Sequence, residues 1–371
     1  MKLFSTLFLG WILLWGGSSL AQSTPEALDT LDIGYLEGRI ESLDEDRAWV
    51  RLANGERIEA QIGITNLGGA EETNENLKFN IGQAVELYFS PGPSGERVYV
   101  ISDWVRRPSI LYLIALFLVV STVVARFKGL RAFLATAISL VIVMQFILRF
   151  ILLGYNPVLI SLLGIGTILI FAIYFVHGLS WSTTAAVIGT FVSVVATLFL
   201  ALFFANLAHF TGFGSEEALY INIAAEEVNL RGLMLAGLLI GALGALTDIT
   251  IVQASVVREL AHLDPSLRAR DLYTRAMNVG RDHVGSLVNT LVLAYTGSAL
   301  PLLLLLQLYQ FSLARALNLE LVASEIIHTL VGSIGLVLAV PLTTIIAANM
   351  FKGNKLPLKA GELGLGHSHQ H

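Results

Sequence analysis

The feature that most constrains this chain is a series of long apolar stretches in its C-terminal two thirds. They occupy about 109–126, 132–153, 158–177, 183–208, 231–257, 284–310 and 325–351. Each is long enough to cross a hydrocarbon layer of about 30 Å as an α-helix. Only 14% of the 371 residues are charged and 55% are hydrophobic, a balance far from that of soluble proteins. The sequence therefore predicts an α-helical polytopic membrane protein with seven spans within residues 108–351.

The region before these spans is different in kind. Residues 1–21 carry Lys2 and a short apolar run that ends in small residues, which predicts a signal peptide, with an uncleaved anchor as the alternative. Residues 22–107 contain short alternating runs separated by Asn-Gly and Pro-Gly pairs, the pattern of strands and hairpins. We expect a small N-terminal extracytoplasmic β-domain there, either an OB or SH3-like barrel or a sandwich.

The charges between the spans predict the orientation. Basic residues follow the first, fifth and last spans, whereas the segment 214–228 is acidic. By the positive-inside rule, the β-domain then lies outside and the C-terminal tail, 352–371, lies in the cytoplasm. The basic segment 258–281 is expected to form either an amphipathic helix on the inner leaflet or a solvated loop.

The fifth span contains an acidic residue, Asp248, near its middle. A carboxylate at this depth costs about 2.5–3.5 kcal/mol on insertion scales, so it normally faces a protein interior or a wet cavity. Gly237, Gly241 and Gly244 precede it at helical spacing and form a narrow face that would let another helix pack closely. Asp248 is thus either a hydrogen-bonding group between helices or a residue that binds and releases protons or ions.

Polar residues of the last two spans have a similar depth. Counted from the flanking basic residues, Asn289 and Thr290 in the sixth span and Thr343 and Thr344 in the last span lie about 12–15 Å from the cytoplasmic edge, like Asp248. Any one of them is more often packing than ligand. Together they predict a polar layer around the carboxylate.

Two motifs in this region resemble those of the YibE/F family of bacterial multi-pass membrane proteins. They are "GLLIGALGALTDITIVQASVVREL" and "GRDHVGSLVNTLVLAYTGSALPLLLL". The resemblance covers roughly 110–351 and places Asp248, Asn289, Thr290 and Tyr295 on motif positions; Ser286 stands where the family commonly has threonine. It implies the bacterial cytoplasmic (inner) membrane and adds Ser286 and Tyr295 to the residues expected to line the cavity.

A weaker likeness concerns mechanism. A small-residue helix with a central aspartate, followed by an Asn-Thr helix, is similar to the core of RND-superfamily proteins such as SecD and SecF. It is an analogy at the level of the fold, which does not establish function.

Several kinds of chemistry are not expected. The chain has no cysteine, a formal charge of −5, and none of the common nucleotide, zinc-protease or serine-hydrolase motifs. We therefore predict no enzyme, no metal, no cofactor and no nucleic-acid partner. The function hypotheses are a transporter or proton-coupled energy transducer and, alternatively, a non-transporting scaffold or envelope assembly factor. The expected partners are the lipid bilayer, a small solute or ion, an envelope protein at the β-domain and a second copy of the chain.

Overall fold

The computed structural model describes residues 34–44, 46–62, 79–92 and 96–354. The predicted segment 1–21 and nearly all of the predicted tail lie outside these residues. The chain divides into two compact units, residues 1–117 and 118–371.

The first unit contains a closed five-stranded barrel. Its strands are β1 (Gly34–Leu43), β2 (Arg47–Leu52), β3 (Arg57–Ile62), β4 (Ala84–Pro91) and β5 (Arg97–Trp104). Their order is β1-β2-β3-β5-β4, and β3 and β5 pair in parallel while the other pairs are antiparallel. This is the strand order of an OB-type barrel, so the barrel prediction is confirmed over the sandwich.

Alternation along the strands explains how the barrel is filled. In β2, Ala48 and Val50 are fully buried, whereas Arg47, Trp49 and Arg51 point outward. This pattern has the period of a strand with one buried face. The interior is formed by Ile40, Ala48, Val50, Ile58, Ala60, Phe79, Val85, Leu87 and Ile101.

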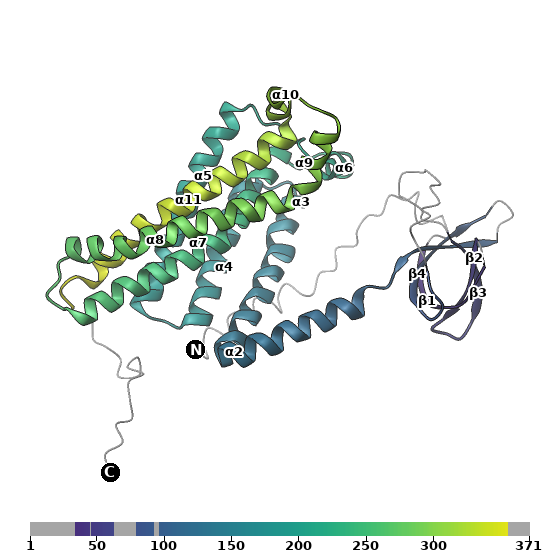
Figure 1. Ribbon diagram of the computed structural model, residues 1–371, viewed down its shortest axis with the longest axis horizontal. Coiled ribbons are helices and arrows are strands. Elements are labelled where there is room, and N and C mark those ends of the chain that lie inside the picture. Colours follow the sequence, from purple (N-terminus) through teal and green to yellow (C-terminus); the bar gives the residue numbers. More distant parts are fainter. Residues whose placement is uncertain (1–33, 45, 63–78, 93–95, 355–371) are drawn as a thin grey trace, which may run out of the picture. The chain divides into compact units, whose positions relative to one another are not determined.

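The rest of the described chain is helical, as Figure 1 shows. In chain order the helices are α2 (Arg107–Ile142), the π-helical η1 (Val143–Leu148), α3 (Arg149–Leu152), α4 (Pro157–His177), α5 (Trp181–Leu207), α6 (Glu216–Ala224), α7 (Leu230–Leu263), α8 (Ala269–Ser298), α9 (Leu300–Leu308), α10 (Leu313–Asn318), α11 (Glu320–Phe351) and the 3-10 turn η2 (Lys352–Asn354).

The count of spans differs from the sequence prediction. Five helical segments are long and apolar enough to cross a membrane, and α8 with α9 forms a sixth span if the pair, bent by 59°, is taken as one. The first two predicted spans both lie in the 46-residue segment Arg107–Leu152. That segment is broken at Arg126, where φ is 51°, and a Cβ at Gly129 would lie 2.2 Å from the carbonyl oxygen of Ser121. The chain therefore turns sharply within α2, which is why one continuous segment covers two predicted spans.

Helices α5, α7 and α11 form the centre of the bundle. Buried aliphatic side chains from these helices and α4 make one continuous core. The outer faces are also apolar: Phe199, Phe203 and Leu207 of α5 are 68%, 61% and 63% exposed. Apolar surfaces on both sides of a helix are typical of spans that face lipid.

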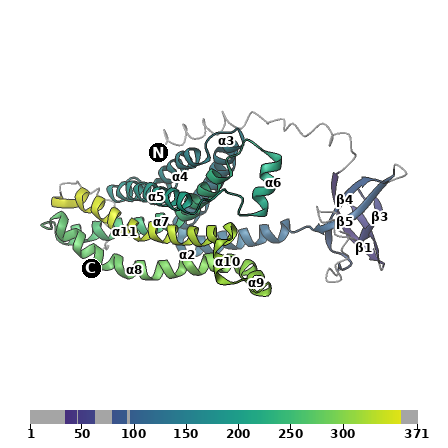
Figure 2. The same ribbon diagram turned by 90° about the horizontal axis from the view of Figure 1, so that it is seen from above.

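The two ends of the bundle carry different elements. In both Figure 1 and Figure 2, α6, α9 and α10 gather at one end, and the turn between α7 and α8 lies at the opposite end. We refer to these as the α6 end and the turn end.

Candidate functional site

Asp248 lies near the middle of α7. Eighteen residues separate it from Leu230 and fifteen from Leu263, or about 27 Å and 22 Å along the axis. It is the only charged residue between Arg231 and Arg258. Within the described residues its carboxylate makes no hydrogen bond or ion pair of its own, and the side chain is exposed in the single chain. The carboxylate is therefore free to interact with water, an ion or another chain.

The small-residue face of α7 is open. Gly237, Gly241 and Gly244 are exposed on the same side as Asp248, and no atom lies within 4 Å of a Cβ built at Gly237 or Gly244. A Cβ built at Gly241 would lie 3.2 Å from the hydroxyl oxygen of Tyr295. The described part of the chain thus places no helix against most of this face. Close packing against this face stays a prediction.

The predicted residues of α8 fall into two groups. Ser286, Asn289 and Thr290 are exposed, and the Thr290 hydroxyl donates to the Ser286 carbonyl within the same helix, at 3.0 Å. Tyr295, in contrast, reaches α7 beside Gly241. Of the polar residues predicted to line the cavity, Tyr295 is the one that the structure brings to the face carrying Asp248.

Thr343 and Thr344 of α11 do not join that face. Both are fully buried. Thr344 accepts a hydrogen bond from Nε2 of Gln253 at 2.8 Å, and the same amide donates to the Ala276 carbonyl at 3.0 Å. Gln253 is five residues after Asp248, which places it about 140° further round the helix. The predicted polar layer is therefore divided between two sides of α7, because depth counting fixes position along a helix but not around it.

The buried side of this layer joins the central helices. Thr190 of α5 and Thr250 of α7 share a hydrogen bond of 2.5 Å. Together with the Gln253 contacts, it links α5, α7, α8 and α11 through side chains that are fully or almost fully buried. Hydrogen bonds of this kind stabilise helix association in an apolar medium.

Sequence reasoning missed His177, the last residue of α4. Its side chain lies close enough to Asp248, and to Lys128 of α2, for electrostatic interaction. The signal was present, since His177 is a titratable residue at the very end of the third predicted span, and no other follows before the fourth. What the sequence lacked was the pairing of the α4 C-terminus with the second half of α7.

A second titratable pair lies toward the α6 end. Tyr295 and Glu325 are close enough to interact electrostatically. Both line a cavity of about 270 Å³ between α8, α9 and α11, whose other walls are mainly aliphatic. Acidic and phenolic groups therefore stand on one side of Asp248 along the bundle, and His177 stands on the other.

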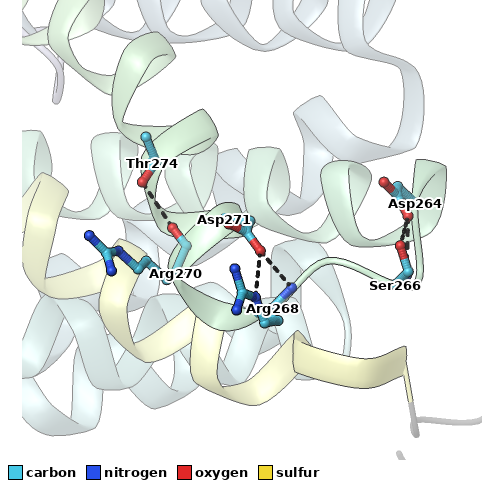
Figure 3. Close-up of polar contacts among 6 residues, drawn as sticks. All are labelled: Asp264, Ser266, Arg268, Arg270, Asp271 and Thr274. Carbon is cyan, nitrogen blue, oxygen red and sulfur yellow. Dashed lines mark hydrogen bonds and ion pairs between the residues drawn. The ribbon is translucent and has the colours of Figure 1, made fainter.

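The turn between α7 and α8 differs from the predicted connector helix. Residues up to Leu263 continue α7, those from Ala269 begin α8, and only Asp264–Arg268 form the turn. Figure 3 shows its contacts: the Ser266 hydroxyl donates to Asp264 at 2.5 Å, and Arg268 Nε donates to Asp271 at 3.1 Å.

Apolar residues of this turn and of the start of α8 pack inside the protein. Leu267 and Leu272 are buried in a cluster with α5, α7 and α11, so they do not form a lipid-facing stripe. The hydrogen bonds from the Ser266 hydroxyl and backbone hold the pKa of Asp264 below its usual value. The short turn thus carries charge at its surface while its leucines anchor it to the bundle.

The fold and the site define a polytopic helical protein with a small N-terminal barrel and a carboxylate in the middle of an apolar helix. The chain belongs to the YibE/F-like family: the family described as YibE/F-like protein matches residues 113–353. The family and the apolar helices together indicate a membrane protein. No curated protein and no solved structure matches the chain, so the likeness to RND proteins gains no support.

Proposed function

We propose that this protein is a transporter or proton-coupled energy transducer of the bacterial cytoplasmic membrane, without enzymatic activity, in which Asp248 binds and releases the coupling proton. The observation that carries the proposal is a carboxylate at the centre of an apolar helix, unpaired among the described residues and the only charge between Arg231 and Arg258. Intramembrane acidic residues are rare and mark ion or proton pathways.

The surroundings of Asp248 support a role in proton movement rather than in packing. A packing carboxylate would be expected to hydrogen-bond to a neighbouring helix, yet the interhelical hydrogen bonds that the second half of α7 makes come from Gln253 and Thr250 on its buried side. Its titratable neighbours are instead spread along the bundle, with His177 toward one end and the Tyr295–Glu325 pair toward the other.

The orientation is part of the proposal. The basic residues Arg258, Arg268, Arg270, Arg275 and Arg281 lie at or near the turn end, and Lys352 follows α11, whose C-terminal turn contacts α7. The acidic helix α6 lies at the opposite end. By the positive-inside rule the turn end faces the cytoplasm and the α6 end faces outward. An extracytoplasmic location of the barrel is part of the same proposal.

Reconstitution tests the proposal directly. Full-length protein in vesicles that enclose a pH-sensitive dye is exposed to a potassium-diffusion potential, with and without an imposed pH gradient. We expect proton movement with the wild type, none with Asp248→Asn, and a reduced rate with Asp248→Glu, which keeps the titration but lengthens the side chain. Equal rates for the wild type and Asp248→Asn would refute the proposal.

The rival is a scaffold whose barrel binds an envelope partner. One observation favours a binding surface there: Trp49 is 39% exposed on the barrel, with the Arg57 guanidinium 4.7 Å from its ring centre. Exposed Trp and Arg are enriched at protein interfaces. Two results together would favour the scaffold. The wild type would move no protons under any gradient, and Trp49→Ala, but not Asp248→Asn, would fail to restore a deletion strain.

A further inference from the structure

A cavity lies beside the second half of α7, toward the turn end. Its volume is about 470 Å³, and it is lined by His177, Ile251, Val252, Ser255, Val256, Glu259, Leu260 and Leu263. Most of these side chains are aliphatic. The polar ones are the imidazole of His177, the hydroxyl of Ser255 and the carboxylate of Glu259, which offer hydrogen-bond partners for water in an otherwise apolar wall.

The cavity begins one helical turn from Asp248. Val252, Ser255 and Glu259 follow Asp248 at intervals of four, seven and eleven residues, so all four lie on one side of α7. The four residues from Asp248 to Val252 correspond to about 6 Å along the axis. His177 stands across from them at the end of α4, close enough to Asp248 to interact with it electrostatically.

Imidazole suits this position chemically. Histidine is the side chain whose ordinary titration falls between about pH 5 and 8, and it commonly serves as a proton shuttle. The titratable or charged groups near it come from two helices: Lys128 of α2, and Asp248 and Glu259 of α7. Glu259 lines the cavity, whereas Asp248 lies one turn before it. A proton leaving Asp248 in this direction meets His177 before it reaches the basic surface of the turn end.

We infer that His177 relays protons between Asp248 and the cavity at the turn end, which is the route by which Asp248 exchanges protons with the cytoplasm. The inference rests on the proposed function. Protonated Asp248 gives its proton, through a bridging water, to neutral His177, which leaves an aspartate and an imidazolium. The imidazolium then releases the proton to water in the cavity near Glu259 and returns to the neutral form.

A purely structural role for His177 predicts different behaviour. As the last residue of α4, before Gly178 with φ of 80°, a cationic His177 would stabilise the negative end of the helix dipole. His177→Lys would then be at least as good as histidine, and His177→Gln would lower stability without changing any pH profile. A relay requires a group that titrates near neutral pH, which neither lysine nor glutamine provides.

The test uses the full chain in the vesicle assay described above, over about pH 5.5–8. We expect His177→Gln and His177→Lys each to lower proton movement by about 100-fold and to flatten its pH dependence, a loss in the range for a missing general acid–base group. The matched control is His209→Asn, at the α6 end, because asparagine tolerates the positive φ of 53° at that position. The control should move protons like the wild type.

The outcomes separate the two claims. If Asp248→Asn abolishes proton movement but both His177 variants keep the wild-type rate and pH profile, the relay is refuted and the proposed function stands. If the wild type itself moves no protons, the proposed function fails, and the relay fails with it.

A second measurement does not depend on activity or on how well the His177 variants fold. Because the chain has no cysteine, Ser255→Cys introduces a single thiol into the cavity wall. We expect a membrane-impermeant maleimide to label it from the cytoplasmic side, and not to label Thr250→Cys, whose position is fully buried. Equal resistance of both thiols to the reagent would show that no water path reaches this wall, and would overturn the inference.

Discussion

Gly189 of α5 and Thr343 of α11 are in such close contact that a Cβ at position 189 would lie 2.3 Å from Oγ1 of Thr343. A second contact of the same kind pairs Gly335 of α11 with Thr197 of α5, where the corresponding distance is 2.1 Å. In the first pair α5 contributes the glycine and α11 the threonine, and in the second pair α11 contributes the glycine and α5 the threonine. Glycine therefore sets the separation of α5 and α11 at two levels, as expected where membrane helices pack through small residues.

The first prediction follows from this contact. Gly189→Ala should lower the free energy of unfolding by about 1–3 kcal/mol, because the added methyl group overpacks a site where neither helix can move freely. The measurement is thermal unfolding of the purified protein in detergent. Gly237→Ala is the matched control: it is also in a helix, no atom lies within 4 Å of its Cβ position, and alanine favours helix by about 1 kcal/mol. Equal destabilisation by both changes would contradict the packing argument.

The second prediction concerns the loop after α5. The Glu320 carboxylate at the start of α11 accepts hydrogen bonds from the Thr211 amide at 3.0 Å, the Thr211 hydroxyl at 2.7 Å and the Gly212 amide at 2.7 Å. Glu320→Ala leaves these donors without their acceptor, which should cost about 1–3 kcal/mol. Hydrogen exchange should show faster exchange of the amides around Gly212 than in the wild type.

The control for this change is Glu320→Gln, which keeps one acceptor oxygen and the length of the side chain. We expect it to retain part of the protection. Unchanged exchange in Glu320→Ala would mean that the loop is held by other contacts, such as the hydrogen bond of 2.6 Å from Arg231 to Asn206.

The features that the sequence predicts well are those determined by the spacing of apolar and polar residues along one strand or helix. Alternation in segments such as Arg47–Leu52 determines which side chains enter the barrel, so the barrel could be predicted. The exposed side of α7 likewise follows from the spacing of Gly237, Gly241, Gly244 and Asp248, although the sequence could not show that no helix among the described residues covers most of it.

The features that the sequence predicts poorly are those decided by contacts between helices far apart in the chain. Thr344 has the expected depth, but its direction is decided by the contact of α11 with Gln253, which no local pattern encodes. The same holds for His177, which gains its significance only because α4 ends beside α7. The connector differs because burial of Leu267 and Leu272 allows α7 to continue to Leu263 and α8 to begin at Ala269, with only a short turn between them.

The third prediction is a pH dependence of the barrel. The Arg51 guanidinium donates a hydrogen bond to Glu41 and holds the pKa of this carboxyl below its usual value; partial desolvation opposes the effect, and the charges of Arg51 and Arg57 add to it. A lowered pKa in the folded state stabilises the barrel above the unfolded pKa of about 4.3, and this contribution is lost as the pH falls through the folded value.

Glu41→Gln should therefore reduce the loss of barrel stability between neutral pH and about pH 3. The measurement is hydrogen exchange of the β2 amides as a function of pH. The effect should be small because the ion pair is exposed to solvent. Glu56→Gln, in the turn between β2 and β3 and without an ion pair among the described residues, should leave the acid dependence unchanged. An identical acid dependence in the wild type and Glu41→Gln would show that this pair does not contribute.

The last prediction tests the open face of α7. Asp248 and the glycines before it are exposed in a single chain, and a carboxylate at this depth is not expected to face lipid. We therefore predict that a helix of another chain packs against Gly244 in the membrane. Gly244→Leu should leave the unfolding temperature of the isolated chain nearly unchanged, since no atom lies within 4 Å of the Cβ position, but should prevent close approach of the second helix and abolish function.

Because the chain has no cysteine, Gly244→Cys provides the complementary measurement: oxidation in native membranes should give a covalent dimer if the partner is a second copy, and a mixed or absent product if it is a different protein. Full function of Gly244→Leu, measured by restoration of a deletion strain, would show that the face needs no partner and that Asp248 is reached by water instead.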